Sequence, residues 1–96
     1  MGEVRVRLYA AAAEAAGSYE LRIETAEDRL PLSELINTLT EQRDSVVKAG
    51  GRSTALSLQH VCAQSSFLIN GTRAGKDSAE VTTNDIVDVL PPFAGG

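Results

Sequence analysis

The chain has 96 residues, a formal net charge of −4 at pH 7, 43% hydrophobic residues and 23% charged residues. This length and composition fit one small globular domain and exclude a disordered chain. The acidic balance argues against binding to nucleic acid, and no apolar run approaches the roughly 18 residues of a membrane span. The first residues do not resemble a secretory signal, so we expect a cytoplasmic protein.

The N-terminal part of the chain predicts two strands joined by a short helical segment. Residues 4–9 and 19–24 alternate apolar and polar side chains, which is typical of strands with one buried face. Between them, residues 10–16 are almost all alanine, and Gly17 is suited to end a helix there. We expect the two strands to pair in antiparallel fashion.

The middle of the chain predicts a main helix and a short helix. The main helix should have Pro31 in its first turn and end near residues 49–51. Its apolar stripe comprises Leu32, Leu35, Ile36, Leu39, Val46 and Val47. Residues 50–55 are expected to form a mobile loop. A short helix should follow within residues 53–64, capped by Ser53 or Thr54. Its apolar face comprises Leu58, Val61 and Cys62.

Three further strands are predicted in the C-terminal third. Residues 66–69 and 72–74 flank Asn70-Gly71, a pair that strongly favours a two-residue hairpin turn. A polar loop at 76–80 and a turn at 83–85 precede residues 86–90, the most apolar of the predicted strands. We therefore expect that last strand in the centre of the sheet, beside the first.

These elements predict an α+β fold, the ubiquitin-like β-grasp. Its mixed five-stranded sheet would have one main helix packed on one face and a short second helix. Val87 and Val89 should face the main helix. The side chains expected on the open face include Arg5, Arg7, Leu68, Asp88 and Leu90. Asp88 would form a cross-strand ion pair with the arginines, and the two leucines would form an apolar docking patch.

Residues 1–90 would form the β-grasp domain and residues 91–96 a flexible tail. Pro91-Pro92 cannot continue a central strand and favours an extended path, so the tail would reach about 20 Å. Gly95 and Gly96 have no side chains and could enter a narrow channel, with Phe93 and Ala94 at its mouth. The carboxylate of Gly96 is the candidate reacting group.

The chain resembles the MoaD family, the small subunits of molybdopterin synthase. The resemblance extends along the chain and includes residues 7–12 with Gly17, residues 34–36, and above all the ending 90–96. ThiS, the sulfur carrier of the thiamine pathway, and ubiquitin-like modifiers share the terminal Gly-Gly. The double proline before it favours MoaD.

The resemblance implies that Gly96 is adenylated with ATP by a MoeB-like enzyme and then converted to a thiocarboxylate by a sulfur donor. The charged tail would enter a MoaE-type large subunit, in a heterotetramer, and give sulfur to a cyclic pyranopterin precursor. This chain would be a carrier without catalytic side chains, without a permanently bound cofactor and without a metal.

Three alternatives remain open from the sequence. The chain could be a ThiS-like carrier for thiazole or cysteine synthesis, a ubiquitin-like modifier joined to lysines through Gly96, or an interaction domain with an idle terminus. Cys62 is expected to be a buried apolar residue rather than a reactive thiol, and His60 has no second ligand at metal-binding spacing.

Overall fold

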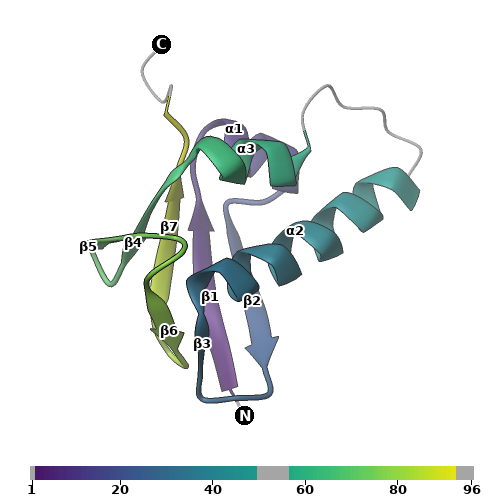
Figure 1. Ribbon diagram of the computed structural model, residues 1–96. Helices are drawn as coiled ribbons and strands as arrows, with labels where there is room; N and C mark the ends of the chain where they lie inside the picture. Colours follow the sequence, from purple (N-terminus) through teal and green to yellow (C-terminus); the bar gives the residue numbers. More distant parts are fainter. Residues whose placement is uncertain (1, 50–56, 93–96) are drawn as a thin grey trace.

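The computed structural model describes residues 2–49 and 57–92, and the side chains of all of these except 44–49 (Figure 1). The main sheet has five strands in the order β2-β1-β7-β4-β5. Their bounds are β1 Gly2–Leu8, β2 Glu20–Thr25, β4 Ser66–Ile69, β5 Thr72–Ala74 and β7 Ile86–Leu90. The helices are α1 Ala11–Ala16, α2 Leu32–Ala49 and α3 Leu58–Gln64.

The first and last strands form the centre of the sheet. They run parallel, with Val6 opposite Val87 and Leu8 opposite Val89. All other neighbours in the main sheet pair in antiparallel fashion. The sheet is therefore mixed, and the predicted α+β ubiquitin-like β-grasp is confirmed.

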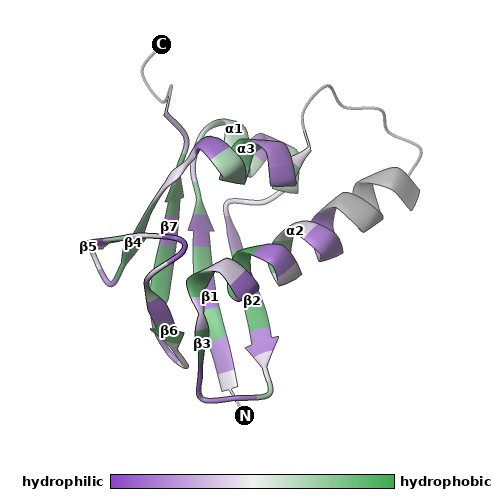
Figure 2. Cartoon of the chain, viewed as in Figure 1, coloured by the Kyte–Doolittle hydropathy of each residue, from purple (hydrophilic) through white to green (hydrophobic). Residues whose placement is uncertain are grey.

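The core lies between the sheet and α2, which crosses one face of the sheet (Figures 1 and 2). The strands contribute alternate side chains to it, namely Val4, Val6, Leu8, Ile23, Phe67, Val87 and Val89. The helices contribute Leu32, Leu35, Ile36, Leu39, Leu58, Val61 and Cys62. Both predicted apolar faces are thus buried as far as side chains are described. Val46 and Val47 lie in α2, but their side chains are outside the described part.

A contact between two helices holds α1 in place. Gly17 ends α1 with a positive φ of 77°, and its N–H donates to the carbonyl of Ala13 at 2.8 Å. Arg43 of α2 then donates from Nε at 2.9 Å and from Nη2 at 2.7 Å to the carbonyl of Ala16. This carbonyl is one of those that a helix end leaves without an internal partner.

Two predictions about helix starts were wrong. Pro31 is the last residue of a strand, β3 Arg29–Pro31, and α2 begins after it at Leu32. The short helix α3 begins later than expected, and its cap is Ser57 rather than Ser53 or Thr54. The hydroxyl of Ser57 accepts from the N–H of His60 at 3.1 Å, which satisfies one of the free donors of the first turn. The predicted loop at 50–55 lies outside the described residues.

A second, two-stranded sheet was not predicted. It pairs β3 with β6 Glu80–Thr82, and Leu30 lies opposite the fully buried Val81. The N–H of Leu32 donates to the carbonyl of Ala79 at 2.9 Å, which joins the start of α2 to this sheet.

Candidate functional site

The tail leaves the domain from the middle of the main sheet. Leu90, the last residue of the central strand β7, is half-buried, Pro91 is buried and Pro92 is exposed. The chain therefore stays packed on the domain for one proline beyond the strand. The other predicted tail residues, Phe93, Ala94, Gly95 and Gly96, lie outside the described residues.

The open face of the sheet carries the two predicted docking leucines. Leu68 lies opposite Asp88, and Leu90 lies opposite Ser66, in the antiparallel pairing of β4 with β7. Both leucines are half-buried, as is Ile86 on the same face of β7. The structure thus places Leu68 and Leu90 on one face, next to the point where the tail begins. Whether a partner docks there stays a prediction.

A buried carboxylate lies in the centre of this open face. Arg7 donates to Asp88 through two hydrogen bonds, from Nε to Oδ1 at 2.6 Å and from Nη2 to Oδ2 at 3.0 Å. The hydroxyl of Tyr9 donates to Oδ1 at 3.2 Å. The hydrogen bonding of Arg7 to Asp88, followed by the charge of Asp88, raises the pKa of the Arg7 guanidinium. It therefore remains a cation throughout the physiological range.

The predicted ion pair is correct for Arg7 and wrong for Arg5. The register places Arg7 opposite Asp88 but Arg5 opposite Ile86. Arg5 instead forms an ion pair with Glu20 of β2 at 3.4 Å. Tyr9 was missed as a partner of Asp88, because the alternation over residues 4–9 indicates which face Tyr9 is on but not the register between β1 and β7.

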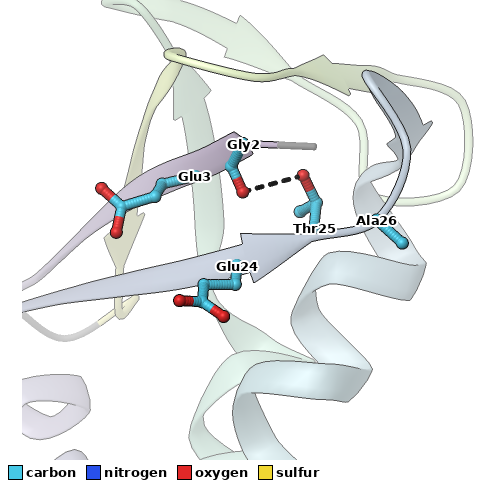
Figure 3. Close-up of a pocket in the computed structure, with 5 residues that line it drawn as sticks. All are labelled: Gly2, Glu3, Glu24, Thr25 and Ala26. Atoms are coloured by element: carbon cyan, nitrogen blue, oxygen red, sulfur yellow. Dashed lines mark hydrogen bonds between the residues drawn. The ribbon is translucent and has the colours of Figure 1, made fainter.

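A hollow lies at the end of the sheet where β1 begins and β2 ends (Figure 3). It has a volume of about 530 Å³ and is lined by Gly2, Glu3, Glu24, Thr25 and Ala26. Thr25 donates across it to the carbonyl of Gly2 at 3.4 Å. Since β1 and β7 are parallel, the tail begins at the far end of the sheet from this acidic hollow.

Two further candidate residues, Cys62 and His60, lie in the short helix α3. Cys62 is only 2% exposed, which confirms its expected burial. His60 is exposed, and its Nε2 lies 3.3 Å from the amide nitrogen of Gln64. Across residues 2–49 and 57–92 there is no cluster of three or more potential metal ligands. Nor is any helix in this part of the chain long and apolar enough to cross a membrane.

Comparison with known families gives one match, which spans nearly the whole chain. The model of the ThiS family matches residues 6–96. A search of curated protein sequences found no significant match.

Several solved structures share the fold. Small archaeal modifier protein 1 from Haloferax volcanii has a TM-score of 0.69 and 21% identity, covering 99% of this chain and 100% of that one. The small archaeal modifier protein 1 of Methanosarcina acetivorans is 28% identical, with a TM-score of 0.62 and coverage of 100% and 98%. A complex of subunits 1 and 2 of the molybdopterin-converting factor of Helicobacter pylori contains a chain with a TM-score of 0.55 and 16% identity, covering 98% of this chain and 99% of that one.

Proposed function

The chain belongs to the ThiS family, a group of ubiquitin-like carriers, and from this we propose that it is the sulfur carrier subunit of a molybdopterin synthase. The observation that carries the proposal is the sequence 90–96, placed at the end of the central strand β7. Its Pro91-Pro92 pair, followed by Gly95-Gly96, is the ending that resembles the MoaD family.

Each part of this segment has a role in the proposal. Burial of Pro91 fixes the root of the tail, and the fixed φ of Pro92 limits its direction. Phe93 and Ala94 engage the channel mouth of the partner. Gly95 allows that partner's backbone to close around the tail, because glycine has no Cβ. Gly96 supplies the reacting carboxylate.

The proposed chemistry begins with activation, because a carboxylate is a poor electrophile at neutral pH. An oxygen of the Gly96 carboxylate attacks the α-phosphorus of ATP, and pyrophosphate leaves. Sulfide (HS⁻) supplied by the donor then attacks the carbonyl carbon of the acyl-adenylate, and AMP leaves as the carbon–sulfur bond forms. The sulfur of the resulting thiocarboxylate displaces an oxygen substituent on a carbon of the cyclic pyranopterin precursor, and water hydrolyses the thioester so formed, which leaves the sulfur on the precursor and restores the Gly96 carboxylate. Two such transfers make the dithiolene.

The proposed partners are a MoeB-like adenylating enzyme, a sulfur donor and a MoaE-type large subunit in a heterotetramer. The complex of subunits 1 and 2 from Helicobacter pylori supports the last of these as a mode of assembly for this fold. Leu68 and Leu90, beside the root of the tail, are the proposed contact for the large subunit. Apolar side chains at the centre of an interface commonly contribute most of its binding energy.

Intact-mass spectrometry tests the carrier chemistry. The purified protein is incubated with the adenylating enzyme, ATP and a sulfur donor. We expect an oxygen-to-sulfur mass shift confined to the C-terminal peptide, and omission of ATP should abolish it. A chain that stays unmodified under these conditions would contradict the carrier role.

The choice of acceptor needs a second measurement. The thiocarboxylate form is mixed with the precursor and the large subunit, and molybdopterin formation is followed. Transfer to a thiazole precursor instead would favour a ThiS-like role, which the family match also supports.

A protein modifier is the second candidate function. The 28% identity to small archaeal modifier protein 1 of Methanosarcina acetivorans favours it. Covalent high-mass adducts that contain this chain, linked through Gly96 to lysines, would support the modifier. Stoichiometric copurification with a MoaE-type protein, without such adducts, would support the synthase.

Replacing Leu68 tests the docking patch. We expect Leu68→Glu to weaken binding to the large subunit by roughly tenfold or more, because a charge would be buried at an apolar contact. Thr72→Glu is a matched control on the neighbouring strand, where the side chain is exposed and lies off the open face. Equal binding by both variants, measured by isothermal titration calorimetry, would remove the patch from the interface.

A further inference from the structure

An arginine pair lies on the same open face as the proposed docking patch, without a carboxylate between its members. Arg5 and Arg22 are directly opposite each other in the pairing of β1 with β2. Both project from the open face, on which like charges directly opposite one another are destabilising. In the free protein this arrangement therefore carries an electrostatic cost.

The nearby carboxylates relieve this cost only in part. Glu20 forms an ion pair with Arg5 at 3.4 Å, but both side chains are more than 40% exposed, so the pair contributes little. Asp85 already accepts from Asn70 at 2.9 Å and from the N–H of Thr82 at 2.8 Å. Arg22 forms no salt bridge with any described residue.

The arginine pair borders a hollow of about 220 Å³. Its lining comprises Glu3, Arg5, Arg22, Asn84, Asp85 and Ile86. Glu3 lies on one side, opposite Glu24, and forms no salt bridge with either arginine among the described residues. The lining therefore combines two guanidinium groups with two carboxylates, but Glu3 pairs with neither arginine and Asp85 is engaged with Asn70 and Thr82. The two guanidinium groups, next to the half-buried Ile86, can thus accept a carboxylate from an otherwise apolar surface.

The hollow is close enough to the tail to belong to the same interface. Arg5 lies opposite Ile86, and Leu90 is four residues further along β7, or about 13 Å at roughly 3.3 Å per residue. A standard interface covers about 800 Å² on each partner, which corresponds to a radius of about 16 Å. A partner centred near Leu68 and Leu90 would thus cover Arg5 as well.

We propose that Arg5 and Arg22 bind a carboxylate on the surface of the protein that activates the tail. This inference rests on the proposed function and adds the chemistry of the partner: an acidic side chain at the rim of an apolar docking surface. The net charge of this chain is −4, so general attraction between opposite charges does not draw an acidic partner to it. The arginine pair provides that attraction locally and fixes the orientation in which the partner meets the open face.

The test measures adenylation of this chain by the activating enzyme of the same organism at several salt concentrations. We expect Arg22→Gln to lower kcat/KM by roughly two- to fivefold at low salt, the range of one exposed ion pair, and Arg22→Glu to lower it further. The loss should lie in KM and shrink as salt rises, with kcat unchanged, because Arg22 lies on the sheet away from the reacting tail.

Arg29→Gln is the matched control. It removes the same charge from β3, where Arg29 forms an exposed ion pair with Glu80 at 3.8 Å, outside the open face. Arg29→Gln should behave like the wild type. An Arg22→Gln variant with the KM and salt dependence of the wild type would overturn the proposal.

Two other outcomes can be told apart from the one that the proposal predicts. If inorganic phosphate shifts the NMR signals of Arg5 and Arg22 at millimolar concentration while Arg22→Gln leaves KM unchanged, the hollow binds a small anion and the proposal is wrong. If the wild type is not adenylated at all, the proposed function fails. Calorimetric binding of the wild type and Arg22→Gln to the same enzyme would then decide the role of the arginine pair separately.

Discussion

Asp88 is only 4% exposed, although it lies on the face of the sheet that no described helix covers. Its burial comes from Arg7 and Tyr9, which lie over the carboxylate and donate three hydrogen bonds to it. The Arg7 side chain itself is 45% exposed. The ion pair therefore joins a buried anion to a cation that water still reaches. Removing the cation and removing the anion should thus differ in their effect on stability.

Replacing Arg7 should destabilise the protein more than replacing Asp88. Arg7→Leu leaves the buried carboxylate with Tyr9 as its only described partner, whereas in Asp88→Ala the half-exposed guanidinium can be hydrated. We expect Asp88→Ala to lower the free energy of unfolding by about 1 kcal/mol, and Arg7→Leu to cause a larger loss. Urea unfolding measures both.

The double variant provides the control for this prediction. Arg7→Leu with Asp88→Ala should recover part of the stability that Arg7→Leu loses, because no unpaired carboxylate remains. Strictly additive losses would contradict a direct coupling. The pKa of Arg7 is raised, so the charge of Arg7 contributes fully at neutral pH and is lost only as the pH rises through that raised value.

Substitutions of Gly71 measure the free-energy cost of a positive φ without a steric contribution. It forms the hairpin between β4 and β5 with Asn70, at φ values of 84° and 51°, and an added Cβ would meet no atom within 4 Å. We expect Gly71→Ala to lower the free energy of unfolding by about 1 kcal/mol, purely through backbone strain. Gly71→Asn should lose less, because asparagine tolerates this conformation better. Thermal unfolding of both variants checks the order.

At the scale of elements, the stability of α1 depends on its contact with α2. The six residues of α1 are too few for an independent helix, and its last carbonyl at Ala16 is satisfied by the guanidinium of Arg43. We expect Arg43→Met to lower the free energy of unfolding by about 1.5 kcal/mol, through the loss of hydrogen bonds from a charged donor. Arg43→Lys should not restore it fully, because an ammonium lacks the fork of two parallel donors.

Hydrogen exchange locates the effect of Arg43. Faster exchange at the N–H groups of Gly17 and Ser18, which bond to the Ala13 carbonyl, would show that α1 loosens first. Loss of protection spread evenly over β1 and β7 would mean that Arg43 supports the whole core instead.

Sequence patterns predicted the elements that have a strong period. The alternation in β1 and β2 and the apolar stripe of α2 were found in this way, β4 and β7 were found as apolar runs, and β5 was found from the Asn70-Gly71 turn before it. The pairing of β3 with β6 was missed because each strand has three residues, too few to show an alternation, and the two are far apart in the chain. Pro31 was placed in the helix because a proline suits both the end of an edge strand and a first helical turn.

The sequence alone identified the residues of the tail, but it did not fully determine which side chains of the open face contact one another. The ending 90–96 is visible in the sequence, and the parity of the strands placed Leu68, Leu90 and Asp88 on the open face. The partner of Asp88 depended on the register between β1 and β7, which a period of two leaves undetermined by steps of two residues. That register places Arg5 opposite Ile86, and Arg5 forms its ion pair with Glu20 of β2 instead.

At the scale of the whole molecule, the proposed function predicts that changes in the tail prevent sulfur loading of Gly96 without changing the stability of the domain. Deleting Gly96, or replacing Gly95 with tryptophan, should abolish formation of the thiocarboxylate. We expect either change to alter the free energy of unfolding by less than about 0.5 kcal/mol, the range of substitutions outside the core. Mass spectrometry measures the loading, and thermal unfolding measures the stability. A large fall in melting temperature would show that the tail packs on the domain.

The parallel pairing of β1 with β7 has a consequence for the order of events during synthesis. The two central strands are Gly2–Leu8 and Ile86–Leu90, so the ribosome makes the second long after the first. Until Leu90 has emerged, β1 lacks its central neighbour and the apolar face of α2 has no complete sheet to cover. Closing a loop of this length also slows folding. A nascent chain that has not yet reached Leu90 would therefore lack the folded face of the sheet, and under the proposed function it would not be recognised for loading.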